Sequence, residues 1–438
     1  MAHRDAVVVG AGPAGLGAAL KLARAGAAVT LVDAAPSPGG LCVTRRRDGF
    51  AYDLGGHIPF VRDDARLAWL RDLLGEDLRW VGRPVACLRD GRIVPGRYLD
   101  QRPARPVGLG GPDGTAAGEL GRRFGPRFVD AAMRPYLEKI DGLPLERIPA
   151  ERARRLLEDQ AAPEGFHFPE SGIGRLMDAM AAAARAAGAE VLMSTPVEAI
   201  EVPGGAIGAV RLADGAGTRL ATRDAVLAMP AGAAARLLTP AAPGSLTRGV
   251  PMRAVCIVIL AVDRDRLSEE PWIQVDLPGV PFSRAFEPGN WSPGMTPDGA
   301  TAIGLECYCA ATGADPVWGL PDAALAAACA RALHEPLGLL DDPDAARLVE
   351  VVRLPRAYPV PDLANLDAIR APAEWLAALG GVHLAPGSAV IEAIEAGERA
   401  AAEVLAGRPA SPCPGAGAPH PRAARPWGRR HGSPRPPP

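Results

Sequence analysis

Lysine is almost absent from this chain of 438 residues: it occurs only at Lys21 and Lys139, and arginine carries nearly all of the positive charge. Alanine, glycine and proline are abundant, a composition that indicates a GC-rich coding bias, so a single arginine is not evidence of a binding site. The formal net charge of −2 gives no overall electrostatic attraction for nucleic acid or for an anionic membrane.

Cysteine is scarce and follows no recurring spacing. There are seven cysteines, an odd number, and no two of them form a CxxC pair. Neither a disulfide framework nor a metal site is therefore expected. Cys307 and Cys309 alternate within an extended apolar segment, GLECYCA, so we expect both thiols to be buried on one face of a strand.

Targeting and membrane-spanning segments are also lacking. The N-terminus, MAHRDAVVVG, has no apolar signal region, and no uninterrupted apolar run approaches the ~20 residues that span a bilayer. We therefore expect a cytoplasmic protein without an integral membrane segment. Its 48% hydrophobic and 22% charged residues are ordinary for a globular protein, and its length indicates two domains or one domain with a large insertion.

The first thirty or so residues alternate between extended and helical patterns. AVVVG (6–10) is typical of a buried parallel strand, AGLGAALKLARAGA (14–27) has a helical pattern, and VTLVD (29–33) is a second strand. A strand, a helix and a strand within about 30 residues indicate a βαβ unit.

The turn inside this unit is rich in glycine, and an acidic residue ends its second strand. The residues concerned are Gly10, Gly12, Pro13, Ala14, Gly15 and Asp33. The first glycine permits a tight turn, the second lets a pyrophosphate approach the backbone, and the third lets the helix pack on the strand. The helix N-terminus offers unpaired N–H groups to the phosphates, and Asp33 can accept hydrogen bonds from a ribose. This pattern predicts a dinucleotide site.

Two further glycine pairs follow. Gly39 and Gly40 precede Leu41 in APSPGGLCVT, which gives a second close approach of the backbone to the cofactor, and YDLGGHIPF (52–60) places another pair before a histidine. With GAGPAGLGAA, these segments resemble a superfamily of flavoproteins that includes FAD-dependent amine oxidases, protoporphyrinogen oxidases, phytoene desaturases and UDP-galactopyranose mutases. Weaker similarity is scattered as far as residue 407.

The resemblance implies non-covalent FAD and assigns roles to residues beyond the first turn. Gly55 and Gly56 would let the backbone lie against the isoalloxazine ring, and His57 would touch the flavin edge or the substrate. A histidine bonded to a backbone carbonyl in a packed loop is the alternative for His57. Further cofactor contacts are expected at Val197, Gly387, Ser388 and Ile391.

Candidates for substrate chemistry lie in two segments. FSRAFEPGNWSP (282–293) resembles a mutase segment that lines a sugar-nucleotide site, and its Arg284 is suited to a carboxylate or phosphate; a surface arginine is the alternative. RPYLEKIDGLP (134–144) carries Tyr136 and Lys139. Amine oxidases often hold a lysine near the flavin, but the position of Lys139 favours the inserted domain.

The chain departs from the family pattern at two places. Val43 stands where many relatives have arginine, and Pro386-Gly387-Ser388 stands where relatives carry a Gly-Asp that bonds the cofactor. The N–H groups of Gly387 and Ser388 could replace that aspartate. Losing one hydrogen bond to a charged group would cost about 1.5–3 kcal/mol, so FAD is still expected to bind.

Three functions remain open at this point. The first is a redox flavoenzyme that oxidises a C–N or C–C bond of a small organic substrate, such as a natural-product intermediate, by hydride transfer to FAD. The second is a non-redox mutase acting on a sugar nucleotide, and the third is a degenerate flavin-binding protein without catalysis. No aromatic pair of the kind that cages amines is recognisable near the C-terminal motif. The acceptor and the oligomeric state are open, with a homodimer as one option.

The predicted fold class is α/β: a Rossmann-like FAD-binding domain with a parallel sheet, plus an inserted α+β substrate domain with a mixed or antiparallel sheet. Strands of that sheet are expected at 253–263 and 300–310. The FAD domain is assigned residues 1–75, 188–240 and 345–407, the substrate domain 76–187 and 241–344, and residues 408–438 are expected to be a disordered tail.

Overall fold

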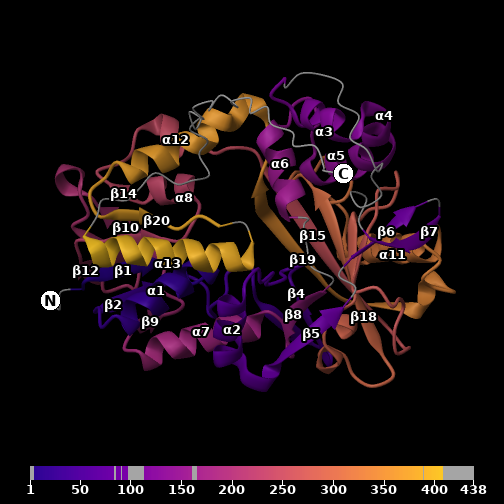
Figure 1. The fold of residues 1–438 in the computed structure, drawn as a ribbon, viewed down its shortest axis with the longest axis horizontal. Coiled ribbons are helices and arrows are strands. Elements are labelled where there is room, and N and C mark those ends of the chain that lie inside the picture. The colour runs from indigo at the N-terminus through magenta and orange to yellow at the C-terminus, as the bar shows by residue number, and fades with distance from the viewer. Residues whose placement is uncertain are drawn as a thin grey trace, which may run out of the picture.

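The computed structural model describes residues 4–82, 85–89, 91–96, 113–159, 165–387 and 389–407. Figure 1 shows two lobes side by side, one built around a parallel sheet and the other around a larger, mostly antiparallel one. Ser388 and the segment 408–438, predicted as a cofactor contact and a disordered tail, lie outside the described residues.

The parallel sheet has five strands in the order β20-β13-β1-β2-β9, and every neighbouring pair is parallel. Its strands are β1 (Ala6–Val9), β2 (Val29–Val32), β9 (Glu190–Leu192), β13 (Ala225–Leu227) and β20 (Val382–Leu384). β1 and β2 are short apolar runs that are buried throughout, because helices cover this sheet. The predicted βαβ unit is therefore present, with α1 (Pro13–Arg24) as its helix.

The helix α13 (Val390–Ala406) packs closely along α1. Glycines make this contact possible: a Cβ on Gly397 would lie 1.8 Å from the carbonyl oxygen of Ala14, and one on Gly17 would lie 2.6 Å from that of Ile394. The other side of α1 contacts α7 (Gly174–Ala186). These contacts fix the axis of the helix whose N-terminus is the predicted phosphate site.

The larger sheet has seven strands in the order β19-β15-β18-β17-β16-β6-β7, all antiparallel except the parallel pair β16–β6. Its strands are β6 (Ala86–Arg89), β7 (Arg92–Pro95), β15 (Met252–Val262), β16 (Trp272–Gln274), β17 (Arg284–Phe286), β18 (Thr301–Cys309) and β19 (Ala346–Pro359). The two strands predicted in this region, β15 and β18, pair directly with each other. The predicted combination of a parallel and a mixed sheet is confirmed.

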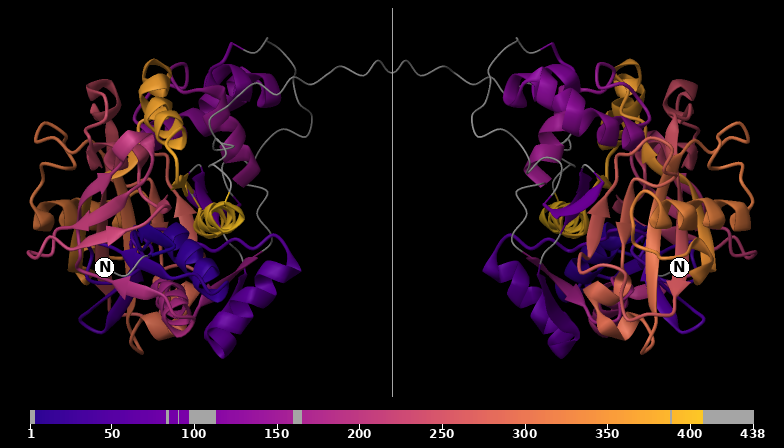
Figure 2. Two further views of the ribbon diagram at one scale, coloured as in Figure 1. Left: turned by 90° about the vertical axis from the view of Figure 1, so that its left-hand side faces the viewer. Right: turned by 90° about the vertical axis from the view of Figure 1, so that its right-hand side faces the viewer.

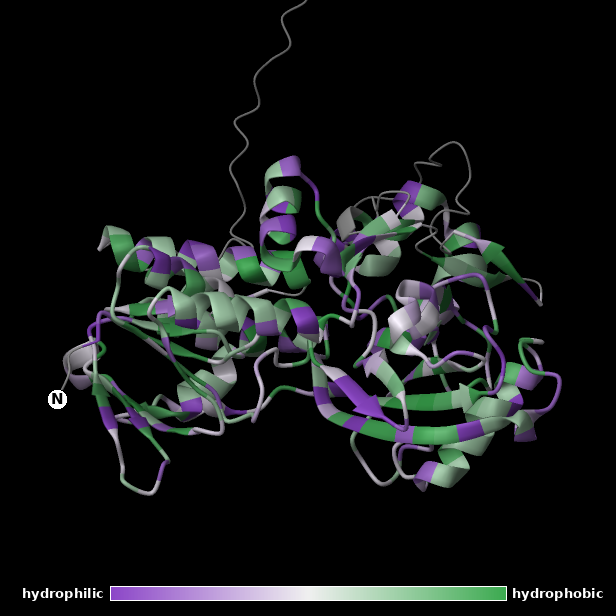
Figure 3. Cartoon of the chain, turned by 90° about the horizontal axis from the view of Figure 1, so that it is seen from below, coloured by the Kyte–Doolittle hydropathy of each residue, from purple (hydrophilic) through white to green (hydrophobic). Residues whose placement is uncertain are grey.

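Both faces of this sheet are covered, which explains why its central strands are so apolar. Along β15, Cys256 and Val258 face the core under α11 (Asp322–His334), whereas Ile257 and Ile259 face the opposite core. Figure 3 shows the strands of both lobes largely in the hydrophobic colour. Cys307 and Cys309 are buried together on the α11 side, as predicted.

A group of short helices covers the opposite side of the substrate lobe, and Figure 2 shows them gathered at the top of the molecule with α12 (Leu366–Ala377). They are α3 (Ala116–Phe124), α4 (Pro126–Phe128), α5 (Arg134–Asp141) and α6 (Ala150–Asp159). The remaining helices are α2 (Asp64–Leu74), α8 (Ala231–Arg236), α9 (Gly244–Thr247) and α10 (Pro288–Trp291).

Smaller sheets complete the fold. Two of them are two-stranded: β3 (Thr44–Arg47) with β4 (Phe50–Asp53), and β5 (Leu78–Gly82) with β8 (Gly165–Pro169). The third sheet has four strands and is formed by β10 (Val197–Glu201), β11 (Ala209–Leu212), β12 (Arg219–Ala221) and β14 (Leu238–Thr239). In the part of the chain that the structure describes, no helix combines the length and apolar character needed to cross a bilayer.

Two segments lie elsewhere than the predicted domain boundaries placed them. The third FAD segment was expected from residue 345, but β19 pairs with β15 in the seven-stranded sheet, so the chain returns to the parallel sheet only at β20. Conversely, α7 falls in the predicted segment 76–187 of the substrate domain, yet it packs on α1. Both differences arise from contacts between distant residues that local patterns do not contain.

Candidate functional site

The glycine turn after β1 has the geometry that its sequence predicts. Gly10 has φ +103°, and a Cβ there would lie 2.6 Å from the carbonyl oxygen of Ala228. A Cβ on Gly15 would lie 1.7 Å from the carbonyl oxygen of Gly10, so α1 can begin this close to β1 only with glycine. Among the described residues, and apart from its neighbours in the chain, no atom lies within 4 Å of the Cβ position of Gly12, so the space in front of this backbone is open. Pro13 is the first residue of α1, and Ala14 follows it.

Asp33 connects the ends of the first two strands. Its carboxylate accepts hydrogen bonds from the backbone N–H groups of Ala11, at 2.6 Å, and Ala35, at 2.7 Å. A carboxylate has about four acceptor positions, so capacity for ribose hydroxyls remains. Asp33 therefore holds the glycine turn in place, and its role as a ribose acceptor stays a prediction.

The second glycine pair folds back over this turn. The N–H of Gly39 donates to the carbonyl of Ala11 at 2.8 Å, and a Cβ on Gly40 would lie 3.4 Å from the Cα of Gly12. Leu41 beside them is 41% exposed, an unusually open position for a leucine. The open space at Gly12 is therefore bordered by the backbone of the second glycine pair.

The C-terminal candidates approach the same edge of the parallel sheet. Gly387 follows β20 and packs so tightly on the first turn of α13 that a Cβ would lie 2.3 Å from the Cα of Ala393. Ile391 is buried in that first turn. Val197 begins β10, two residues after Thr195, whose N–H bonds the carbonyl of Asp33. Their roles as cofactor contacts stay predictions.

The Gly55–His57 loop leaves β4 and meets the larger sheet. Gly55 has φ +104°, and the N–H of Gly56 donates to the Oε1 of Glu306 on β18 at 3.1 Å. A Cβ on Gly56 would lie 3.4 Å from the ring of Trp272 on β16. Glycine therefore lets this backbone lie directly between the two lobes, where sequence reasoning placed the flavin.

Two ring nitrogens beside this loop are buried and have no hydrogen-bond partner among the described residues: Nδ1 of His57 and Nε1 of Trp272. A buried polar group left unpaired costs about 1–3 kcal/mol, which favours a ligand that completes it. Burial lowers the pKa of His57, and the nearby Glu306 carboxylate opposes that effect. The lowered pKa favours the neutral form of the imidazole, and among the described residues no backbone carbonyl bonds its Nδ1.

Arg284 lies in a polar cluster on the same side of the sheet. Its Nε donates to the hydroxyl of Tyr136 at 2.9 Å, and its Nη1 donates to the hydroxyl of Tyr308 at 2.8 Å. Tyr308 donates in turn to Oε2 of Glu306 at 2.8 Å, and that oxygen is 3.4 Å from Arg284. The guanidinium also stacks over Trp272, with its central carbon 5.1 Å from the ring centroid.

The charge of this cluster is balanced. Burial lowers the pKa of Arg284, but the oxygens of Tyr136, Tyr308 and Glu306 outweigh it and hold the pKa well above its ordinary value. The Arg284 side chain keeps 20% of its surface accessible. The surface alternative for Arg284 is therefore wrong, since it lies in a polar cluster beside the Gly55–His57 loop.

Tyr358 at the end of β19 forms the outer wall of this cluster. Its ring stacks on Tyr308 with centroids 6.2 Å apart and an angle of 22° between the planes. Its surface is 47% accessible, yet burial by surrounding atoms raises its pKa. Tyr358 therefore adds an aromatic ring to the polar cluster around Arg284.

Lys139 points elsewhere. Its ammonium donates to the carbonyl oxygens of Phe282, at 2.7 Å, and Leu277, at 3.2 Å, and burial lowers its pKa to about 8. It therefore braces the 277–282 segment, although its neighbour on α5, Tyr136, reaches Arg284. This agrees with the expectation that Lys139 belongs to the inserted domain.

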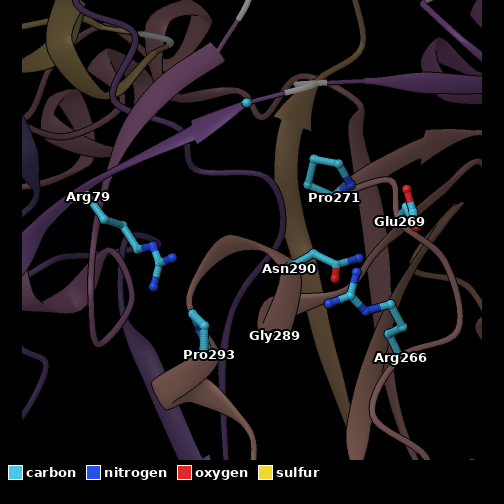
Figure 4. A pocket seen from close by; sticks show the side chains of 8 residues that line it. Arg79, Arg266, Glu269, Pro271, Gly289, Asn290 and Pro293 are labelled. Atoms are coloured by element: carbon cyan, nitrogen blue, oxygen red, sulfur yellow. The ribbon is translucent and has the colours of Figure 1, made fainter.

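A separate cavity of about 360 Å³ lies near β5 and α10, and none of the predicted cofactor residues lines it. Figure 4 shows Arg79 and Arg266 turned towards it from opposite sides, with Asn290 between them. The amide nitrogen of Asn290 already donates to the backbone carbonyls of Ser268 and Glu270. This cavity is distinct from the open space at Gly12.

Sequence reasoning missed Glu306, Trp272, Tyr308 and Tyr358. A signal for two of them existed: in GLECYC, Glu306 and Tyr308 alternate with the cysteines, so a strand must place them together on the face opposite the thiols. A buried glutamate on an otherwise apolar strand indicates a polar partner. That this partner is the Gly56 backbone, 250 positions away, has no local signal.

Comparison with known families agrees with this geometry. The family model described as "Flavin containing amine oxidoreductase" matches residues 153–405, more than half of the chain. A second family model, an NAD(P)-binding Rossmann-like domain, matches residues 8–73. Among curated proteins, a ferredoxin–NADP reductase of Verminephrobacter eiseniae (strain EF01-2) is 49% identical over 59 residues, which are 14% of this chain and 16% of the reductase.

Several solved structures share the fold. A reduced UDP-galactopyranose mutase superimposes with a TM-score of 0.74 at 20% identity, covering 92% of this chain and 96% of the mutase. A putative protoporphyrinogen oxidase from Exiguobacterium sp. 255-15 gives 0.68 at 20% identity, covering 92% and 99%. Putrescine oxidase bound to putrescine gives 0.66 at 18% identity, covering 92% and 99%. At such identities the likeness establishes the fold alone.

Proposed function

This chain belongs to the family of flavin containing amine oxidoreductases and is a flavin-dependent oxidoreductase; from that premise we propose that it binds FAD without a covalent bond and oxidises a C–N or C–C bond of a small organic substrate. The observation that carries the proposal is the pairing of two features. The backbone in front of Gly12 is open, and two unpartnered ring nitrogens, on His57 and Trp272, stand beside the Gly55–His57 loop.

The residues present fit a dinucleotide at one end and a flavin ring at the other. The N-terminus of α1 and the Gly39–Gly40 backbone would hold the pyrophosphate, and Asp33 would hold the adenosine ribose. Gly387 and Ile391, with Ser388 beyond the described residues, would approach the cofactor from α13, and Val197 from β10. The Gly55–His57 loop would face the ring.

Non-covalent binding is supported by the chemistry of Cys42. This thiol follows the second glycine pair and is the cysteine nearest to it in sequence, but only 5% of its surface is exposed. Burial, with a smaller contribution from Asp53, raises its pKa to about 12. A thiol in that state is a poor nucleophile, so we expect the flavin to be released when the protein is denatured.

His57 and Arg284 would have different roles in the reaction of the substrate. A bound flavin supplies the hydride acceptor. His57, with an unpartnered Nδ1, would take a proton from a nitrogen or a neighbouring carbon of the substrate, while the hydrogen of the oxidised C–H bond leaves as a hydride. Arg284 would orient the substrate from the polar cluster, and Trp272 would donate its N–H to an oxygen of the ligand.

The test begins with the absorption spectrum of the purified protein. A flavin spectrum, with FAD recovered in the supernatant after heat denaturation, is the expected result. Anaerobic mixing with amine and porphyrinogen candidates should then bleach the flavin, and His57→Gln should slow the bleaching at least tenfold while keeping the bound flavin. Colourless protein that does not bind added FAD would support a degenerate protein instead.

A sugar-nucleotide mutase is the second candidate, and the polar cluster around Arg284 is what favours it. The Arg284 side chain is 20% accessible, and a guanidinium suits a phosphate as well as a carboxylate. The same anaerobic experiment separates the two functions. A mutase would convert a sugar nucleotide on prereduced flavin without net oxidation, whereas an oxidoreductase would leave it unchanged.

A further inference from the structure

The carboxylate of Glu306 forms hydrogen bonds to both halves of the candidate site. Its Oε1 accepts the N–H of Gly56, and its Oε2 accepts the hydroxyl of Tyr308. Only 3% of Glu306 is exposed, and it stands on β18 in the interior of the seven-stranded sheet. A buried carboxylate is expensive unless its oxygens are bonded, and here both are.

We propose that Glu306 is a positioning residue, which fixes the Gly56 peptide against the larger sheet and sets the charge that faces His57. The role of His57 as proton acceptor rests on the proposed function, but the placement of Glu306 does not. No family match or sequence motif assigns a role to this residue.

The hydrogen bonds leave the Gly56 peptide little freedom. Gly55 and Gly56 lack side chains that could hold the loop, and Gly55 has a backbone conformation open mainly to glycine. The loop's own bonds are the local ones from the N–H of His57 to Gly55 and from Ile58 to Gly56. Among the described residues, it is the hydrogen bond from Gly56 to Glu306 that ties this loop to a strand of the other lobe.

Among the described residues, few charged side chains lie around His57. Glu306 on β18 is the acidic group that acts on it, and Arg284 on β17 lies behind Glu306. Tyr308, also on β18, lies between these two groups, and the phenols of Tyr136 on α5 and Tyr358 on β19 complete the surroundings. On the loop's own strand, Asp53 is turned to Thr44 and Ile173.

The Tyr308 hydroxyl links Arg284 to Glu306 through two hydrogen bonds with a fixed order of donor and acceptor. Tyr308 accepts a hydrogen bond from Arg284 and donates one to Glu306, so it relays the position of the guanidinium to the carboxylate. A negatively charged substrate group at Arg284 would draw the guanidinium away from Glu306. The carboxylate would then be less compensated and would favour protonation of His57 more strongly. Substrate capture would thereby prepare His57 to accept a proton.

The experiment compares Glu306→Gln with the matched control Glu287→Gln in the full-length protein. Glu287 is also a buried glutamate of this lobe, 2% exposed, and its bonds go to Thr301, Leu267 and Ser268. The titration of His57 is followed by NMR of protein labelled at its seven histidines, with the His57 signal assigned by its loss in His57→Gln. Glu306→Gln should lower the midpoint by about 1 pH unit or more, because a charge within 4–6 Å typically shifts a pKa by that amount.

A second measurement separates the hydrogen bond from the charge. Glutamine keeps an acceptor for the Gly56 N–H, whereas alanine does not. Hydrogen exchange of the peptide containing Gly56 should therefore stay slow in Glu306→Gln and become about tenfold faster in Glu306→Ala. Addition of benzoate to the wild type should raise the His57 midpoint, and it should not do so in Arg284→Gln.

The outcomes are distinct. An unchanged His57 midpoint in Glu306→Gln, or an equal shift in Glu287→Gln, would overturn the proposal, as would unchanged exchange at Gly56 in Glu306→Ala. These readouts need no substrate turnover. A protein that binds no flavin would therefore contradict the proposed function while the Glu306 measurements still decide the present one.

Discussion

At the scale of single residues, Asp53 gives the clearest pH dependence. It is buried next to the Gly55–His57 loop and accepts hydrogen bonds from the hydroxyl of Thr44 and the N–H of Ile173. These bonds favour the charged form, but burial outweighs them and raises its pKa from 3.8 to about 7. The folded protein therefore binds a proton that the unfolded chain has already released between those two values.

The direction in which pH changes the stability follows from that difference in bound protons. Because the folded state holds more protons between pH 4 and 7, its free energy of unfolding must fall as the pH rises through this range, by up to about 4 kcal/mol from Asp53 alone. Asp53→Asn removes this contribution. Urea unfolding at pH 5 and pH 8 should show a smaller loss of stability on going to pH 8 in Asp53→Asn than in the wild type; equal losses would contradict the assignment.

Lys139 tests whether a buried lysine is structural or catalytic. Lys139→Met leaves the carbonyls of Leu277 and Phe282 without their donor, so we expect the free energy of unfolding to fall by about 1–3 kcal/mol. The flavin spectrum and its rate of reduction should stay unchanged, because the Lys139 ammonium bonds backbone carbonyls of the 277–282 segment and not the Gly55–His57 loop. Lys21→Met, at a partly exposed position of α1, is the control and should alter stability by less than about 0.5 kcal/mol.

At the scale of elements, the contact between α1 and α13 decides whether the phosphate helix is in place. Gly397→Ala would put a methyl group 1.8 Å from the Ala14 carbonyl, a backbone atom that cannot move alone. The two helices must separate, so we expect a loss of about 1–3 kcal/mol in stability and weaker retention of flavin. Both are measurable by denaturant unfolding and by flavin content after dialysis.

The matched control for this change is Gly121→Ala in α3. This glycine also lies inside a helix, but no atom stands within 4 Å of its Cβ position. Alanine is favoured over glycine in helices by about 1 kcal/mol, so this variant should be as stable as the wild type or more stable. If both variants behaved alike, close packing of α13 on α1 would not be what places the helix.

At the scale of the whole molecule, the sequence predicts local units well and distant contacts poorly. The unit from β1 to β2 was predictable because its strand, helix and glycine turn lie within thirty residues and each leaves its own pattern. The strands β15 and β18 were predictable because both their faces are apolar. By contrast, no pattern indicated that β19, inside the predicted FAD segment 345–407, pairs with β15, since that partner lies some ninety positions earlier.

The candidate site shows the same limit. His57 and Arg284 were singled out from separate segments, but nothing local indicates that Glu306, Tyr308 and Trp272 stand between them. The cofactor residues themselves stay predictions. What the structure adds is the set of contacts across the lobes, and these are formed by side chains whose own neighbours in sequence are apolar.

One such contact holds the β3–β4 hairpin, from which the Gly55–His57 loop continues, to the larger sheet. The hydroxyl of Tyr52 donates to Glu350 of β19 at 2.6 Å, and Arg45 forms an ion pair with the other oxygen of the same carboxylate. Tyr52 is completely buried, whereas the Arg45 side chain is 44% exposed. The two partners of Glu350 should therefore differ in their energetic contribution.

Removing the buried partner should be the more costly change. Tyr52→Phe leaves a carboxylate oxygen without its donor at the junction of the lobes, and we expect a loss of about 1–3 kcal/mol in stability together with weaker flavin retention, because the displaced hairpin carries the Gly55–His57 loop with it. Arg45→Gln should cost less than about 1 kcal/mol, since an exposed ion pair contributes little. Thermal unfolding and flavin release, measured side by side in both variants, check this order. A larger effect of Arg45→Gln would mean that charge, and not the buried phenol, joins the hairpin to the sheet.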